Sequence, residues 1–202
     1  MSESISQPQE ITQQQGSGRN EPDQGKSGQP EPRKHAYLVD SSIYIFRGWH
    51  VYSDEIVDAE GNPSNAIYGF TEFLRELLEL EQPEYIACAF DARQTDSYRR
   101  EIFPEYKANR PPQPVELKNQ FKHCRDFCRA AGIADFSSNR FEGDDIIGTL
   151  ATRLRNEGFR ITILSADKDL AQLLRPGDVW WDYARNKILH YKDCLLYTSP
   201  SP

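Results

Sequence analysis

Short apolar runs alternate with stretches of helical spacing along the chain from His35 onward. Apolar runs of strand length predict buried strands at His35–Ser42, Glu84–Ala92, the beginning of Phe159–Leu174, Asp178–Trp181 and Lys187–Tyr191. Apolar residues spaced three and four apart predict helices over Ser64–Pro83, over Val115–Ile133, over a stretch that ends near Asn156, and in the second part of Phe159–Leu174. Ser64 or Asn65 is the expected N-cap of the first helix. Strands that alternate with helices predict an α/β fold with a mainly parallel, wound sheet and helices on both faces.

The first 34 residues differ from the rest of the chain in composition. They are almost entirely Gln, Ser, Gly, Pro, Glu and other polar types, which bury too little apolar surface to offset the entropy lost on ordering. We expect a disordered tail over residues 1–34 and a single folded domain over residues 35–193. No apolar run is long enough for a signal peptide or a membrane span, which favours a cytoplasmic location without membrane partners.

Acidic residues follow the predicted strands and open one predicted helix. The positions are Asp40, Asp91, Glu142, Asp144, Asp145, Asp167 and Asp169. In a wound sheet, strand ends and helix starts share the edge where ligands bind, so we expect these seven carboxylates to converge. Taken singly, each acid has a simpler explanation as a loop residue or as a helix cap.

Seven converging carboxylates require compensating positive charge. Like charges repel and raise one another's pKa, whereas Mg²⁺ and Mn²⁺ bind carboxylate oxygens readily. The chain carries a net charge of −7, of which −6 lies after the tail, and without the seven acids the body would be near +1. Two such ions about 3.5–4 Å apart suit the hydrolysis of a phosphodiester. The sequence offers no competing Ser-His-Asp or Cys-His arrangement and no Gly-rich phosphate loop.

The stretch Arg93–Pro114 is basic, aromatic and interrupted by prolines, and it lacks a period that would face a core. Its basic and aromatic side chains are Arg93, Arg99, Arg100, Lys107, Arg110, Tyr98, Phe103 and Tyr106. Cations bind phosphates, and aromatic rings stack on unpaired bases. Taken alone, the stretch is explained more simply as a solvated loop, but its position directly after Asp91 makes it a candidate substrate clamp.

The chain has four cysteines, none of them in a Cys-x-x-Cys pair: Cys88, Cys124, Cys128 and Cys194. Cys124 and Cys128 are four residues apart, with His123 beside them, which is one half of a zinc-site pattern. A structural zinc site needs a second ligand pair, and the sequence contains none. We therefore expect buried, reduced thiols in a reducing compartment.

Several motifs occur in a characteristic order: "LVDSS", "NAIYGF", "FDAR" followed by "YRREIFPEYKANRPPQP", "FEGDDIIGTLA" and "LSADKDLAQLL". In this order and spacing the chain resembles the 5′-nuclease domain at the N-terminus of bacterial DNA polymerase I and the related stand-alone 5′–3′ exonucleases and flap endonucleases. The resemblance covers about Ala36 to Asp193. It implies a PIN-like α/β fold with a helical arch formed by the Arg93–Pro114 segment, and a nuclease that depends on Mg²⁺ or Mn²⁺.

The resemblance also implies roles for individual residues. All seven carboxylates would be metal ligands, directly or through water, and Asp144 and Asp167 would act in catalysis together with Lys107, the counterpart of the family's active-site lysine. The residues implied to bind nucleic acid are Arg99, Tyr106, Lys107 and Arg110. The implied substrates are DNA with a 5′ single-stranded flap or a 5′ end and RNA primer–DNA hybrids, cut by a monomer that holds two ions in the full-length parent.

The C-terminal part of the chain departs from the family pattern. The family continues with a "GDxSDN"-like pair of aspartates and a helix–hairpin–helix region, so we expect this domain to be truncated and its activity impaired. Residues 194–202, "CLLYTSPSP", change character abruptly and resemble a non-native, adapter-like tail.

Two other classes of function stay open. A non-catalytic module with a nuclease fold would bind branched DNA and release no products in Mg²⁺ or Mn²⁺. A Mg²⁺-dependent phosphohydrolase of small molecules would also carry aspartates at its strand ends. The basic and aromatic stretch weighs against this second alternative.

Overall fold

The computed structural model describes residues 34–91 and 97–193, which all belong to one structural unit. Both predicted tails lie outside the described residues, apart from Lys34. The unit contains a six-stranded sheet in the order β3-β2-β1-β4-β5-β6. Its strands are β1 (His35–Asp40), β2 (Tyr85–Asp91), β3 (Ala134–Ser138), β4 (Arg160–Leu164), β5 (Val179–Asp182) and β6 (Lys187–His190). Only β6 is antiparallel to its neighbour, so the predicted mainly parallel α/β sheet is confirmed.

The helices of the described residues are α1 (Ser41–Val51), α2 (Asn65–Glu81), α3 (Tyr98–Ile102), α4 (Val115–Ala130) and α5 (Gly143–Asn156), with 3-10 helices η2 (Lys168–Leu173) and η3 (Tyr183–Arg185). Ser64 is the N-cap residue of α2, as predicted, but its side chain makes no capping hydrogen bond to the helix. The Ser64 hydroxyl donates instead to the carbonyl of Asn62, and the buried Asn65 amide donates to the carbonyls of Trp49 and Tyr52. The side chain of Asn65 therefore ties α2 to the end of α1.

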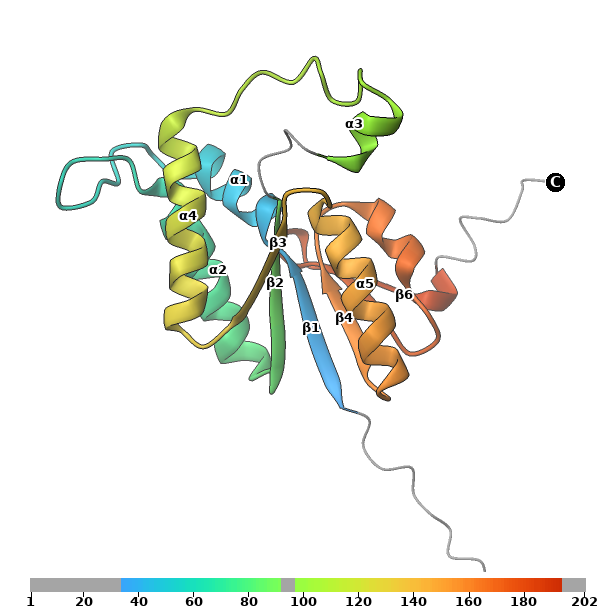
Figure 1. The fold of residues 1–202 in the computed structure, drawn as a ribbon. Helices are drawn as coiled ribbons and strands as arrows, with labels where there is room; N and C mark the ends of the chain where they lie inside the picture. Colours follow the sequence, from blue (N-terminus) through green and yellow to red (C-terminus); the bar gives the residue numbers. More distant parts are fainter. Residues whose placement is uncertain (1–33, 92–96, 194–202) are drawn as a thin grey trace, which may run out of the picture. The chain divides into compact units, whose positions relative to one another are not determined.

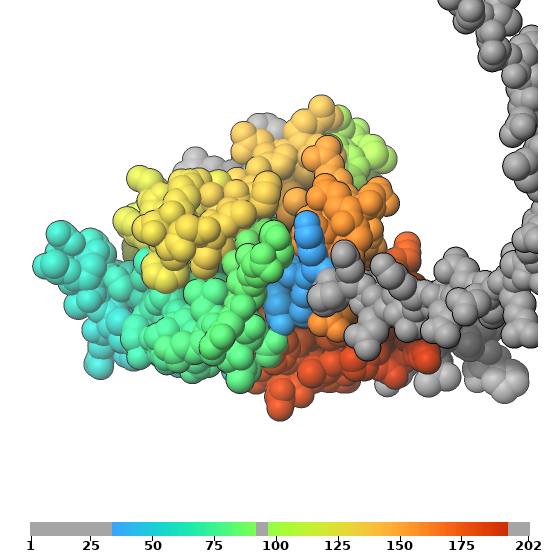
Figure 2. Space-filling view, turned by 90° about the horizontal axis from the view of Figure 1, so that it is seen from below, coloured from blue at the N-terminus to red at the C-terminus, as the bar shows by residue number. Residues whose placement is uncertain are grey.

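The helices divide between the two faces of the sheet, as predicted (Figure 1). Alternate residues of β1 serve the two cores, because successive side chains of a strand point to opposite faces. Tyr37 and Val39 pack with α1, α2 and α4, whereas Ala36 and Leu38 pack with α5 and η2. Figure 2 views the sheet from its amino-terminal end, where β1 lies between the surfaces of α2 and β2 on one side and of α5 on the other.

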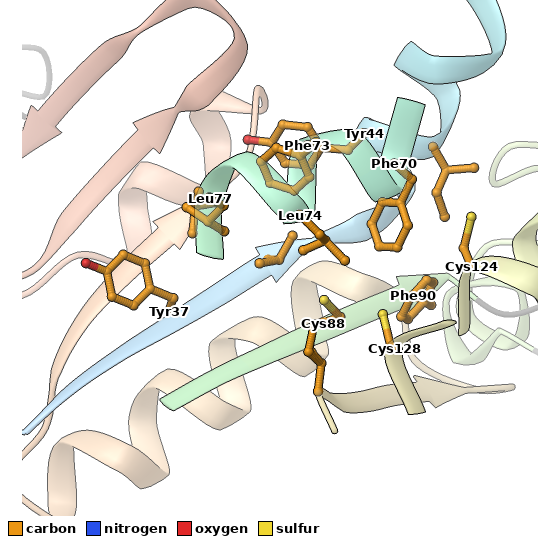
Figure 3. Packing of buried hydrophobic residues seen from close by; sticks show 14 of the residues in the cluster. Tyr37, Tyr44, Phe70, Phe73, Leu74, Leu77, Cys88, Phe90, Cys124 and Cys128 are labelled. Atoms are coloured by element: carbon orange, nitrogen blue, oxygen red, sulfur yellow. The ribbon is translucent and has the colours of Figure 1, made fainter. Parts of the chain in front are cut away.

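The first of these cores is rich in aromatic side chains and thiols (Figure 3). The rings of Tyr44 and Phe73 stack with their centroids 3.8 Å apart. Cys88 on β2 and Cys128 on α4 are buried and free, as is Cys124, so the expectation of buried thiols is confirmed for these three. Cys194 lies outside the described residues.

In the connection from β2 to α4, residues 97–114 lie over the carboxyl end of the sheet (Figure 1). Within it, α3 is followed by turns over residues 104–109 and by an extended segment that reaches the start of α4 (Figure 1). Residues 97–114 fall within the expected arch, and we refer to them as the arch segment. Arg93 lies outside the described residues. None of the helices among the residues described is both long enough and apolar enough to cross a membrane.

Candidate active site

Four separate parts of the chain bring carboxylates to the carboxyl edge of the sheet. Asp40 is the last residue of β1 and Asp91 the last residue of β2, the strand that pairs with β1 in parallel. Glu142 is the N-cap residue of α5, and Asp167 is the N-cap residue of η2 just after β4. Parallel pairing of β2, β1 and β4 therefore places these acids along one edge.

Asp40 is buried, with 6% of its surface exposed. Its Oδ2 accepts a hydrogen bond of 2.8 Å from the Ser165 hydroxyl, whose oxygen accepts a 3.0 Å bond from the backbone N–H of Asp167. The pKa of Asp40 is raised to about 7, first by burial and then by the charges of Asp144 and Asp91, against the lowering effect of the Ser165 bond. Ser165 thus links the ends of β1 and β4.

Asp91 is held by the start of α5. Its Oδ1 accepts a 2.6 Å hydrogen bond from the backbone N–H of Gly143, and its own backbone N–H donates to the Ser42 hydroxyl. A Cβ atom at Gly143 would lie 3.3 Å from the Asp91 Oδ1, tighter than most real contacts of that kind. Glycine at this position lets the first turn of α5 approach the end of β2.

The pKa of Asp144 is raised in the folded protein. Partial burial raises its pKa to about 6, and the charges of Asp91, Asp167 and Glu142 act in the same direction, opposed by Lys107. The charge of Asp144 in turn raises the pKa of Asp40. We call Asp40, Asp91, Glu142, Asp144 and Asp167 the acidic cluster, because these five carboxylates repel one another in the folded protein.

Side chains of the arch segment contact the carboxylates of Glu142 and Asp145. Lys107 donates to Glu142 Oε1 over 2.8 Å, and the Tyr106 hydroxyl donates to Oε2 of the same carboxylate over 3.2 Å. Arg99 forms a bidentate pair with Asp145, with N–O distances of 2.5 and 2.8 Å. Burial alone would raise the pKa of Asp145, but the Arg99 guanidinium, the backbone N–H of Glu142 and the charge of Lys107 together lower that pKa.

Two of the residues expected at the site lie at its margin. Asp169 is exposed, and its backbone N–H, rather than its carboxylate, contacts the cluster through a 2.8 Å bond to Asp167 Oδ1. Arg110 is exposed and forms no ion pair with any residue in 34–91 or 97–193. The structure therefore brings together the acidic cluster, Asp145, Arg99, Tyr106 and Lys107, but not the side chains of Asp169 and Arg110.

The donor chemistry of the cluster suits a hard divalent cation. Carboxylate oxygens are the preferred ligands of such ions. Burial, and after it the neighbouring carboxylates, raises the pKa of Asp40 and of Asp144, and a nearby cation would favour their charged forms. Across the described residues, however, no three acidic, histidine or cysteine side chains are already arranged to enclose an ion. Glu142 is engaged by Lys107 instead, so cation binding requires some carboxylates to exchange partners.

Ser165, Ser42 and Gly143 position site carboxylates and were not singled out from the sequence. Each is a small residue within two positions of a predicted acid, which is a weak signal because such residues are common at strand ends and helix starts. Their roles depend on contacts between segments up to 125 residues apart.

Comparison with known proteins places the fold and the motifs in a family. A sequence model described as the 5′-3′ exonuclease, N-terminal resolvase-like domain matches residues 35–195. DNA polymerase I of Bacillus caldotenax is 40% identical over 144 residues, which make up 71% of this chain and 16% of that protein. DNA polymerase I of Geobacillus stearothermophilus is 44% identical over 139 residues, or 69% of this chain and 16% of that protein. The chain thus spans about a sixth of the length of these relatives.

Solved structures agree on the fold. The bacteriophage T5 D15 protein, co-crystallised with metal ions, has a TM-score of 0.63 at 19% identity, covering 81% of this chain and 60% of that one. A D15 flap endonuclease variant in a pseudo-enzyme-product complex with DNA and metal ions has the same TM-score at 18% identity and the same coverage. Because this sequence model matches residues 35–195, the chain belongs to the 5′-3′ exonuclease family and contains its N-terminal resolvase-like domain.

Proposed function

We propose that this chain carries the nuclease centre of a metal-dependent 5′–3′ exonuclease and 5′-flap endonuclease that hydrolyses phosphodiesters of DNA and of RNA primers in replication and repair. The observation that carries the proposal is the acidic cluster at the carboxyl edge of the sheet, bordered by Arg99, Tyr106 and Lys107. Carboxylates that hold cations, next to side chains that hold phosphates, are what phosphodiester hydrolysis requires. The names of the relatives support the same reading.

The cofactors we propose are two Mg²⁺ or Mn²⁺ ions. The candidate ligands, directly or through water, are Asp40, Asp91, Glu142, Asp144, Asp145, Asp167 and Asp169. Such ions, when bound, lower the pKa of a water molecule and stabilise the leaving oxygen. The exposed Asp169 lies one residue into η2, so its proposed contact is through water.

The protein's own contribution is to position charge. Ser165 orients the Asp40 carboxylate, and the Gly143 N–H orients that of Asp91. Lys107 and Arg99 would bind the phosphate of the substrate once their carboxylate partners turn to cations, because each then has donors free. Tyr106, within 3.2 Å of Glu142, would lie beside the same phosphate.

One observation favours the alternative of a non-catalytic binding module. Lys107 already neutralises Glu142, and Arg99 neutralises Asp145, so the fold holds these charges without a metal ion. The small-molecule phosphohydrolase has no such support, since the arch segment surrounds the cluster with cations and aromatic rings. Buried free thiols support a reducing, cytoplasmic setting for the chain.

The test is cleavage of a 5′-labelled flap DNA by the full chain in Mg²⁺, in Mn²⁺ and in chelator, read on a denaturing gel. We expect short products only with a divalent ion, and none from the Asp144→Asn variant. Asp54→Asn, which changes an exposed aspartate outside the cluster, is the matched control and should cut normally. Binding of the flap without products in either metal would favour the non-catalytic module. Hydrolysis of p-nitrophenyl phosphate without cleavage of DNA would favour the small-molecule enzyme.

A further inference from the structure

The buried indole of Trp180 packs against the segment that carries Asp167. Trp180 lies within β5, where it pairs with Ile163 of β4, and 1% of its surface is exposed. Its ring belongs to the same core as Leu170 and Ala171 of η2. No motif of the sequence gives Trp180 a role at the site, so any such role depends on how β5 and η2 pack together.

The indole N–H makes the shorter of two hydrogen bonds to the backbone carbonyl of Asp167. Trp180 Nε1 lies 2.9 Å from this oxygen, whereas the backbone nitrogen of Leu170, which closes the first turn of η2, lies 3.4 Å from it. Because N–H···O bonds are usually about 2.7–3.2 Å long, the bond within η2 is weak. The position of the Asp167 carbonyl therefore depends on the indole more than on η2 itself.

Asp167 is held on both sides of its α-carbon. Its backbone N–H donates to the Ser165 hydroxyl oxygen over 3.0 Å, and its carbonyl accepts from Trp180. Its Oδ1 accepts a 2.8 Å bond from the backbone N–H of Asp169, which fixes the direction of the carboxylate once the backbone is fixed. The Asp167 carboxylate is thus directed by contacts at three of its own atoms.

We propose that Trp180 is a positioning residue of the metal centre: its indole N–H fixes the Asp167 carbonyl and thereby holds the Asp167 carboxylate ready for a divalent cation. This inference rests on the proposed function. Groups that orient a metal ligand raise the affinity for the metal, because a ligand that moves freely must be ordered when the ion binds. Trp180 acts through Asp167 and is not itself a ligand.

The competing explanation is that Trp180 only fills space in the core, and the next residue of the strand separates the two. Trp181 is also buried, with 9% of its surface exposed, but its ring packs in the core on the other face of the sheet. Its Nε1 has no hydrogen-bond partner among the residues that the structure describes. Trp181→Phe therefore shrinks a buried ring without removing a side-chain hydrogen bond, and it is the matched control for Trp180→Phe.

The first measurement is made without metal. Hydrogen exchange of the backbone amides of the full chain is followed by NMR in chelator, with the Asp169 N–H as the reporter because it donates to the Asp167 carboxylate. We expect Trp180→Phe to speed this exchange about fivefold, the effect of one lost hydrogen bond. Trp181→Phe should leave it unchanged. Urea unfolding of both variants checks that each is folded.

The second measurement is the affinity for Mn²⁺ in the absence of nucleic acid. Mn²⁺ is titrated into each protein, and the free ion is measured by electron paramagnetic resonance. Trp180→Phe should bind Mn²⁺ about tenfold more weakly than the unaltered chain, because the Asp167 carboxylate is no longer held in place. Trp181→Phe should bind it as the unaltered chain does.

Three results would overturn the proposal. Equal exchange and equal Mn²⁺ affinity in the two variants would mean that the indole N–H has no effect of its own. Faster exchange in Trp180→Phe with unchanged Mn²⁺ affinity would mean that the indole holds Asp167, but not for a cation. No Mn²⁺ binding by the unaltered chain would overturn the proposed metal centre and this inference with it, whereas the first two results leave the proposed function standing.

If Trp180→Phe does not fold, the unaltered chain still decides the matter. Its three tryptophans give indole N–H signals in the NMR spectrum, which Trp49→Phe and Trp181→Phe assign. On titration with Mg²⁺, the Trp180 signal should shift more than the Trp181 signal, because the Trp180 N–H is bonded to a residue of the centre. Equal shifts of the two signals would overturn the proposal.

Discussion

Because Asp40 is buried, replacing it should have opposite effects on the stability of the protein and on its activity. Its carboxylate is almost wholly buried, and its pKa rises from an ordinary value of 3.8 to about 7. The change Asp40→Asn keeps the shape of the side chain and leaves an oxygen that can accept the Ser165 hydrogen bond. It removes the buried negative charge, so the variant should be more stable than the unaltered chain without metal, while losing nuclease activity.

The magnitude follows from the pKa. A rise of about 3 pH units corresponds to at most about 4 kcal/mol at about 1.4 kcal/mol per unit. Water and rearrangement of neighbouring charges reduce this, so we expect a gain of about 1–3 kcal/mol in the free energy of unfolding at pH 8.

The sign of the pH dependence can be worked out in the same way. Because the folded pKa lies above the unfolded one, the unfolded chain releases the Asp40 proton first as the pH rises. The unaltered chain therefore loses stability between about pH 4 and pH 7, and Asp40→Asn avoids that loss. The advantage of the variant should grow across this range and level off above it.

The assay is urea unfolding in chelator at several pH values from 4.5 to 8, with Asp54→Asn as the control for the loss of one surface charge. A second series with Mg²⁺ should stabilise the unaltered chain more than Asp40→Asn, because the variant lacks one proposed ligand. The reasoning is refuted if Asp40→Asn is no more stable than the unaltered chain at pH 8 in chelator. It is also refuted if the difference between them does not change with pH.

Two further substitutions test the positioning of the site. Gly143→Ala places a Cβ atom 3.3 Å from the Asp91 carboxylate and should displace it. We therefore expect about tenfold slower flap cleavage, with less than about 1 kcal/mol lost from the free energy of unfolding in urea. Cleavage at the unaltered rate would contradict this prediction. Lys107→Met removes the nearer of the two cations beside the buried Glu142, Lys107 at 2.8 Å and Arg99 at 3.7 Å, which should cost about 1–3 kcal/mol in chelator. Mg²⁺ should then raise the melting temperature of Lys107→Met more than that of the unaltered chain, and equal increases would argue against a cation beside Glu142.

Apolar patterning predicted those parts of the fold in which burial dominates. Strands β1 and β2 are continuous apolar runs, and their terminal acids lie at the expected edge because parallel strands end together. The strand β3 was missed because Asp135, Ser137 and Ser138 interrupt it, as an edge strand with partial exposure allows. Helix α1 was missed because it begins directly after β1, with Ser41 and Ser42 read as the end of the strand.

The residues of the site could be predicted from the sequence, but the contacts between them could not. The order of acids along the chain, together with the wound topology, places them at one edge. Which acid faces which cation depends on how the arch segment folds over α5, and Lys107 reaches Glu142 with a left-handed backbone, φ +54°, that no local pattern indicates. The bond from Ser165 to Asp40 likewise requires β4 to pair with β1.

That pairing of β4 with β1 also determines when the centre comes into existence during synthesis. Asp40 leaves the ribosome 125 residues before Ser165, and Asp167 follows two residues later. Until that point a nascent chain has β1, β2 and α5 but lacks the strand that adjoins β1 and carries Asp167 to the edge. A nascent chain that ends before Ser165 therefore lacks both the hydrogen bond that orients Asp40 and the Asp167 carboxylate at this edge.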